Sequence, residues 1–120
     1  MYENLTRYIS MLEKKLYSGK SAGLSGYDYN NFLKHMIDDV YDFANPEKNY
    51  YEVLGKAGIN EKNYMQISVS MLDGDTIFAL IFTAILREKY DAGLILKLCE
   101  NGCFLKWFKR LKEIDWREVE

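Results

Sequence analysis

The sequence contains a single histidine, His35, and that scarcity limits the chemistry available to it. The usual zinc enzymes use two or three histidine ligands, so one histidine excludes those sites. Two cysteines, Cys99 and Cys103, make neither a disulfide framework nor a closed metal site. Nucleophile elbows, glycine-rich nucleotide fingerprints and triad patterns are missing as well. We therefore predict no resident metal, no cofactor and no enzymatic activity.

Long apolar runs are also missing. The uncharged stretch from Thr76 to Leu86 is shorter than the roughly 20 residues that cross a bilayer. The first residues do not resemble a signal peptide. We expect a cytoplasmic protein that does not contact a membrane.

Proline is scarce, and one proline with eight glycines leaves little room for disordered linkers. The length of 120 residues predicts one domain, 1–120, with a core of its own. The net charge of −2 gives no overall attraction to nucleic acid, so we expect no direct nucleic-acid binding.

Tyrosine, in contrast, is abundant, with ten residues. Tyrosine is enriched at protein interfaces because its ring can be buried while its hydroxyl stays hydrogen-bonded. Five tyrosines fall outside any clear apolar stripe: Tyr17, Tyr27 and Tyr29 in the 17–29 loop, and Tyr51 and Tyr64. The helix expected after this loop is rich in acidic residues. The predicted partner-binding residues are taken from these tyrosines and acidic residues: Tyr27, Tyr29, Asp38, Asp42, Tyr51 and Tyr64.

The stretch from Thr76 to Leu86 is apolar on every side, which is typical of a buried helix. We predict a central helix over residues 71–89. Ser70 would be its N-cap in a capping box with Asp73, and Arg87 and Lys89 would lie in its last turn.

Helical periodicity predicts further helices over residues 2–16, from Asp28 or Asn30 to Ala44, 91–101 and 103–115, with fraying after that. Asn45 and Pro46 predict the start of another helix, which Gly58 and Ile59 would end. Residues 65–71 alternate like a strand, so an extended segment or short turn is expected there. The predicted fold is an all-α compact bundle of about six helices, with at most a vestigial two-strand pairing to the 17–27 loop.

Three sets of charged residues each allow two interpretations, one functional and one structural. His35, Asp39 and Asp42 share a helix face and would form a metal or acid–base site, or simply a solvated face. Arg87 would bind a carboxylate or phosphate, or complement the helix dipole and pair with Asp39 or Asp42. The basic residues near the end of the chain would steer a partner or form a solvated surface, which we favour; they are Lys97, Lys106, Lys109, Arg110 and Lys112.

Several groups of residues resemble a bacterial and phage family known as domain of unknown function 6508. They are Leu72-Asp73, Ala79-Leu80, Arg87-Glu88, Gly93-Leu94, Gly102, the run from Trp107 to Asp115, the stretch from Phe32 to Phe43 and the break at Asn45-Pro46-Glu47. The resemblance starts near Phe32 and departs at residues 17–30, where members carry a longer insertion. It implies a bacterial or mobile-element origin and a single domain, and it brings no mechanism.

These observations favour a non-enzymatic protein that acts by stoichiometric contact with a protein partner. One specific form is an inhibitor of a CRISPR-type bacterial defence complex, whose basic, nucleic-acid-binding surface would meet the acidic residues. The alternative is a pocket protein that binds or hydrolyses a small nucleotide-like ligand through His35, Asp39 and Arg87.

Overall fold

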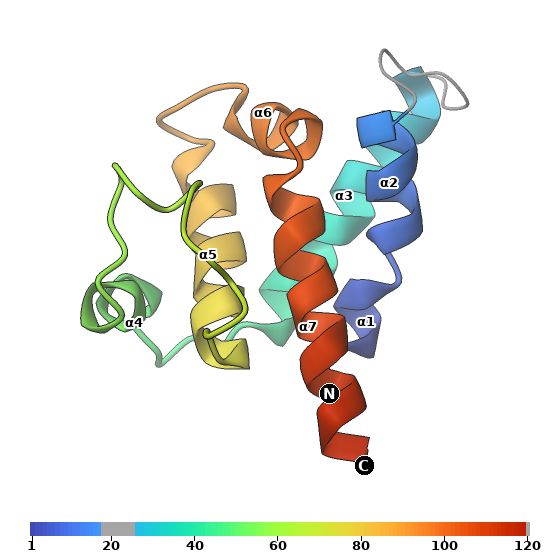
Figure 1. The fold of residues 1–120 in the computed structure, drawn as a ribbon. Helices are drawn as coiled ribbons and strands as arrows, with labels where there is room; N and C mark the ends of the chain where they lie inside the picture. Colours follow the sequence, from blue (N-terminus) through green and yellow to red (C-terminus); the bar gives the residue numbers. More distant parts are fainter. Residues whose placement is uncertain (18–25, 120) are drawn as a thin grey trace.

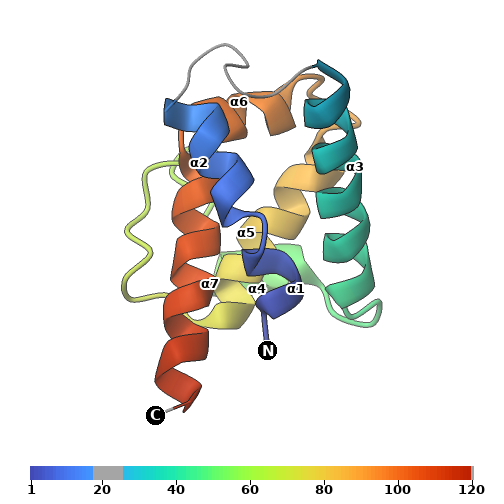
Figure 2. The same cartoon turned by 90° about the vertical axis from the view of Figure 1, so that its right-hand side faces the viewer.

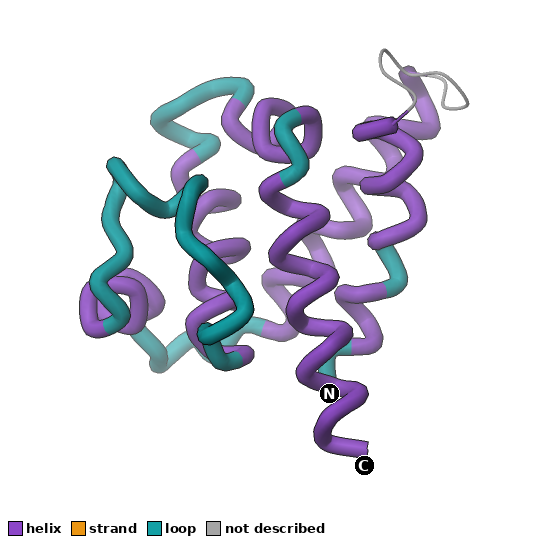
Figure 3. Tube along the Cα trace, in the orientation of Figure 1, coloured by secondary structure: helices purple, strands orange, loops and turns teal. Residues whose placement is uncertain are grey.

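The computed structural model describes the backbone of residues 1–17 and 26–119 and the side chains of residues 1–14 and 31–117 (Figure 1). Its helices are α1 (Glu3–Thr6), α2 (Ile9–Tyr17), α3 (Gly26–Phe43), α4 (Tyr50–Lys56), α5 (Gly74–Arg87), α6 (Leu94–Glu100) and α7 (Cys103–Val119). No strand occurs in the described residues, as Figure 3 shows, so the all-α prediction is confirmed. The predicted strand partner, residues 17–27, lies largely outside the described residues. None of the described helices is both long and apolar enough to cross a membrane.

Helix α5 lies at the centre of the molecule. It contacts α3, α4, α6 and α7, and the two views show these helices on different sides of it (Figures 1 and 2). Ile77, Leu80 and Ile81 are at most 1% exposed. The prediction of a buried central helix is therefore confirmed, although the helix is shorter than residues 71–89.

The N-cap of α5 is Asp73, and the predicted cap at Ser70 is wrong. The Asp73 Oδ1 atom accepts a hydrogen bond from the Thr76 backbone N–H at 2.9 Å. Ser70 lies three residues earlier and is exposed, with its Oγ atom 3.2 Å from that of Ser68. Serine and aspartate are both favoured at the N-cap position, but the backbone becomes helical only after Asp73.

Two other predicted helix starts are wrong for a similar reason. Helix α4 starts at Tyr50 with Asn49 as its N-cap, whereas the Asn45 side chain accepts from the Glu47 N–H in the preceding turn, at 2.9 Å. Helix α6 has no cap at Asp91. Instead the Glu88 carboxylate accepts from the N–H groups of Gly93 and Ile95, at 2.6 and 3.0 Å.

Three helix boundaries also differ from those predicted by the helical periodicity of the sequence. The expected helix 2–16 is split into α1 and α2 at Arg7 and Tyr8, whose side chains both contact Asp39. Helix α3 starts at Gly26, before the expected caps, and α7 continues to Val119. The predicted end of α4 is confirmed: Gly58 has a φ of +74°, and the Ile59 N–H donates to the Leu54 carbonyl at 2.9 Å.

Residues 59–73, here called the 59–73 segment, connect α4 to α5. Met65, Ile67 and Val69 are half-buried against the core and alternate with exposed Gln66 and Ser68, as the strand-like pattern predicts.

Two side chains of α7, rather than a second strand, bind carbonyl groups of this segment at Met65 and Leu72. The Lys106 Nζ atom donates to the Met65 carbonyl at 3.1 Å, and the Arg110 Nε and Nη2 atoms donate to the Leu72 carbonyl at 3.1 Å. Arg110 is only 7% exposed. The expectation that both residues belong to a solvated basic surface is therefore wrong.

Candidate functional site

One hollow of about 450 Å³ gathers aromatic and charged side chains from four separate parts of the chain. We call it the tyrosine hollow. It lies where the start of α4, the 59–73 segment, the end of α5 and the start of α6 meet. Its lining residues are Tyr51, Glu61, Tyr64, Arg87, Tyr90, Asp91 and Leu94.

Local turns hold these residues in place. The Asn60 side chain accepts from the N–H groups of Lys62 and Asn63, and the Tyr64 N–H donates to the Asn60 carbonyl at 3.0 Å. At the end of α5, the N–H groups of Tyr90 and Asp91 both donate to the Arg87 carbonyl, at 2.9 and 2.8 Å. The two turns therefore position Tyr64 on one side and the residues from Arg87 to Asp91 on the other as parts of the lining of the tyrosine hollow.

Tyr64 and Arg87 form the floor of the hollow. Tyr64 is 8% exposed and packs against the buried Trp107 with ring centroids 6.3 Å apart. The Arg87 guanidinium carbon lies 4.9 Å from the centroid of the Tyr64 ring, which is the geometry of a cation–π contact. Burial raises the pKa of Tyr64, and the Arg87 charge opposes that rise. The Tyr64 hydroxyl therefore stays protonated at neutral pH.

The charges of the hollow are not paired with one another. Across the part of the chain that the structure describes, no carboxylate lies within ion-pair distance of Arg87, and neither Glu61 nor Asp91 meets a basic group. The predicted pairing of Arg87 with Asp39 or Asp42 is therefore wrong. Tyr51 and Tyr90 are 49% and 92% exposed. These groups remain available to bind another molecule.

The structure separates the predicted partner-binding residues into groups. Tyr51 and Tyr64 line the tyrosine hollow together with Arg87, which the sequence places in the alternative ligand site. Asp38 and Asp42 are exposed on α3 and are not among the residues that line the hollow. The backbone of Tyr27 and Tyr29 belongs to the first turn of α3 rather than to a loop. Their side chains lie outside the described residues.

The predicted ligand-binding group of His35, Asp39 and Arg87 does not form one site. Asp39 accepts hydrogen bonds from the Tyr8 hydroxyl and the Arg7 guanidinium, and these contacts lower its pKa, with that of Tyr8 contributing most. Asp39 therefore holds the junction of α1 and α2 against α3. His35 is exposed on α3, and neither residue lines the hollow that contains Arg87. In the described parts of the chain, no cluster of three or more histidine, cysteine or acidic residues could hold a metal ion.

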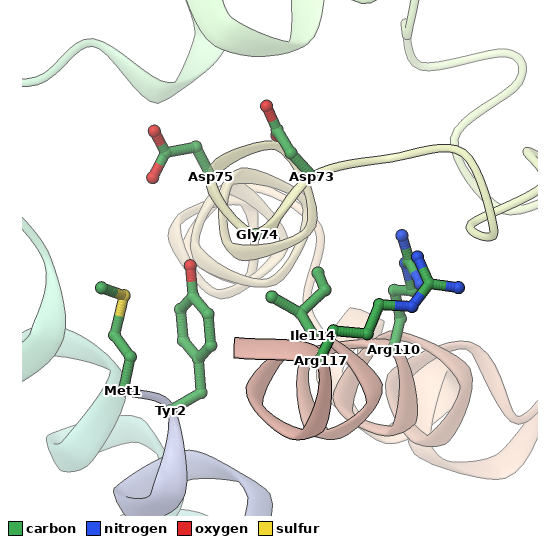
Figure 4. A pocket seen from close by; sticks show the side chains of 8 residues that line it. All are labelled: Met1, Tyr2, Asp73, Gly74, Asp75, Arg110, Ile114 and Arg117. Carbon is green, nitrogen blue, oxygen red and sulfur yellow. The ribbon is translucent and has the colours of Figure 1, made fainter. Parts of the chain in front are cut away.

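A second hollow, of about 510 Å³, lies at the start of α5 (Figure 4). Most of its charged groups already make stabilising contacts within the protein. Asp73 caps α5, Asp75 pairs with Lys48 at 2.8 Å, and Arg110 binds the Leu72 carbonyl. Figure 4 also shows the Tyr2 hydroxyl directed at Gly74, so the ring fills one side of the hollow. Although it is larger, this hollow has fewer polar groups to offer a ligand than the tyrosine hollow.

Sequence reasoning missed Tyr90, Glu61 and Asp91 as site residues. Tyr90 and Asp91 follow Arg87 closely, so a signal was present in the tyrosine and acid next to a helix-ending arginine. Glu61 carries no such signal, because only the fold of the 59–73 segment brings it to the hollow.

Comparison of the chain with models of protein families, with curated proteins and with solved structures finds no match. The resemblance to domain of unknown function 6508 therefore stays a prediction. The function of the site is inferred from the chemistry of its own residues.

Proposed function

We propose that this chain acts by stoichiometric binding of a protein partner and that the tyrosine hollow is its contact site. The observation that carries the proposal is Arg87, which lies half-buried beside the Tyr64 ring in a hollow that Tyr51 and Tyr90 also line, and which forms no ion pair with the described residues. Tyrosine and arginine are enriched among the residues that contribute most to protein–protein affinity. The lining residues include no histidine, serine or cysteine, which favours binding over covalent or acid–base catalysis by those groups.

An inhibitor of a bacterial defence complex, the form suggested by the family resemblance, is one protein of this kind. In that form, the exposed Asp38 and Asp42 on α3 would add a second acidic surface for a basic partner.

Photo-cross-linking in the organism that encodes the chain tests this proposal. Tyr90 is replaced by p-benzoylphenylalanine, and Met71, which is 88% exposed and does not line the hollow, carries the same group as a matched control. We expect one dominant protein adduct at position 90 and none of the same mass at position 71. Adding Tyr51→Ala should weaken the adduct at position 90. Equal adducts at both positions, or no adduct at position 90, would contradict the proposal.

A second candidate function, binding of a small nucleotide-like ligand, is favoured by one observation. A guanidinium lies beside aromatic rings in a hollow whose volume falls in the range of roughly 300–1,000 Å³ that is typical of ligand sites. A nucleotide panel with a thermal-shift readout tests it, because a ligand that binds only the folded state raises the melting temperature. Under this alternative, Arg87→Gln should abolish the rise, whereas under protein binding no nucleotide should produce one.

A further inference from the structure

The charge of the tyrosine hollow indicates what the partner presents to it. The hollow is lined by two carboxylates, those of Glu61 and Asp91, and one guanidinium, that of Arg87, so its lining residues carry one net negative charge at neutral pH. The faces of aromatic rings also attract cations, because the π-electrons make the ring face negative. A cationic group therefore complements the hollow better than an anionic one.

The hollow already holds one guanidinium against a tyrosine. Arg87 lies over the Tyr64 ring, 4.9 Å from its centroid. Within the described residues, the rings of Tyr51 and Tyr90 have no aromatic or cationic neighbour of this kind. The exposed rings of Tyr51 and Tyr90, and two carboxylates that form no ion pair with the described residues, thus remain for a second cation.

We infer that the protein partner inserts an arginine side chain into the tyrosine hollow, where Tyr51 and Tyr90 stack on its guanidinium and Glu61 and Asp91 accept its hydrogen bonds. The inference rests on the proposed function. Arginine fits better than lysine because its planar guanidinium can stack on a ring and bind a carboxylate through two parallel hydrogen bonds. Arg87 sets the depth to which the partner's side chain can enter, because two like charges repel each other.

Peptide titrations followed by NMR test the inference. The probes are acetylated and amidated Gly-Arg-Gly, Gly-Lys-Gly and Gly-Glu-Gly. We expect Gly-Arg-Gly to shift the ring resonances of Tyr51, Tyr64 and Tyr90 and to bind more tightly than the lysine peptide. The double variant with Glu61→Gln and Asp91→Asn should weaken this binding by about fivefold. The matched control, Glu3→Gln with Glu47→Gln, removes two exposed carboxylates that do not line the hollow and should change the affinity little.

Tighter binding of Gly-Glu-Gly, or no shift of the three tyrosines with any peptide, would overturn the inference. The cross-link at position 90 separates this failure from failure of the proposed function. If the adduct depends on Tyr51 but survives the Glu61→Gln and Asp91→Asn changes, the chain binds a protein without an inserted arginine. If the adduct depends on neither the tyrosine nor the carboxylates, both proposals fail.

Discussion

At Gly74 the side chain of Tyr2 occupies the space that a Cβ atom would need. A Cβ built there would come 2.1 Å from the Tyr2 hydroxyl oxygen and 2.7 Å from the ring carbon that carries it. Tyr2 is 4% exposed and also packs against Phe43, with ring centroids 5.2 Å apart, so it has little freedom to move away. The glycine therefore allows the N-terminal residues to cover the start of α5.

The first prediction is that Gly74→Ala lowers the free energy of unfolding by about 1–3 kcal/mol, the usual cost of overpacking. Urea denaturation measures the change. Gly55→Ala is the matched control, because Gly55 lies inside α4 and a Cβ atom added to it would meet no atom within 4 Å. Alanine favours a helix over glycine, so this control should gain roughly 0.5–1 kcal/mol. Equal effects of the two substitutions would refute the role assigned to Tyr2.

Tyr64 shows why its position in the sequence alone misjudged its exposure. Its position in the sequence, away from any apolar stripe, suggested an exposed side chain. In the structure it is buried between Trp107 and Arg87, with one edge in the tyrosine hollow. Loss of its ring would disturb the core as well as the hollow, so Tyr51 and Tyr90 are the better residues for measuring binding.

For the helices, the second prediction concerns the start of α5. Asp73→Ala should lower the free energy of unfolding by about 1 kcal/mol at pH 7, because the Thr76 N–H loses its acceptor. Ser70→Ala is the control and should have little effect, since Ser70 caps no helix. Urea denaturation of both variants separates the observed cap from the one predicted by the capping-box pattern. A larger loss for Ser70→Ala would contradict the structure.

The same cap has a defined pH dependence. The contacts from Thr76, first its side chain and then its backbone N–H, lower the pKa of Asp73. A carboxyl group whose pKa is lower in the folded state stabilises the protein fully above its unfolded value of about 4. That contribution is lost as the pH falls through the lower, folded-state value. The difference between the wild-type chain and Asp73→Ala should therefore shrink below about pH 4.

The third prediction concerns the 59–73 segment. Arg110→Met should lower the free energy of unfolding by about 1–3 kcal/mol, because the Leu72 carbonyl loses both of its donors on Arg110. Hydrogen exchange in residues 65–72 should also become faster. The control is Lys109→Met on the same helix, where the lysine is 48% exposed and pairs with Glu13, a contact worth about 0–1 kcal/mol. Unchanged exchange in Arg110→Met would show that Arg110 does not hold the segment.

Local patterns predicted the helices better than their ends. The apolar run from Thr76 to Leu86 identified α5, and the Gly58–Ile59 pair identified the end of α4. Helix starts were mispredicted where two capping residues stand close together, as with Asn45 and Asn49, because tertiary contacts decide which one the chain uses. Nor could a local pattern reveal that Glu88 caps the following helix.

At the scale of the whole molecule, contacts between distant parts of the chain were the hardest feature to predict from the sequence. The alternation of Met65 and Ile67 correctly predicted which side chains are partly buried, but their carbonyls bind Lys106, about 40 residues away. The tyrosine hollow is similar, because residues from Tyr51 to Leu94 meet there only after α4, α5 and α6 have packed. The sequence suggested Tyr51, Tyr64 and Arg87 separately, and only the fold shows that they share one site.

The last prediction tests the packing of the entire bundle through Ile81, which is fully buried in α5. Ile81→Asp would place an unpaired carboxylate among the helices that surround α5, at an effective cost of several kcal/mol. Such a loss approaches the total stability of a small domain, so the variant should be insoluble or lack a cooperative thermal transition. Leu96→Asp is the matched control, because Leu96 is 40% exposed in the first turn of α6, where a negative charge is tolerated. Calorimetry and circular dichroism should show a cooperative transition for Leu96→Asp alone. If Ile81→Asp also unfolds cooperatively near the wild-type temperature, α5 cannot be the buried centre around which the other helices are packed.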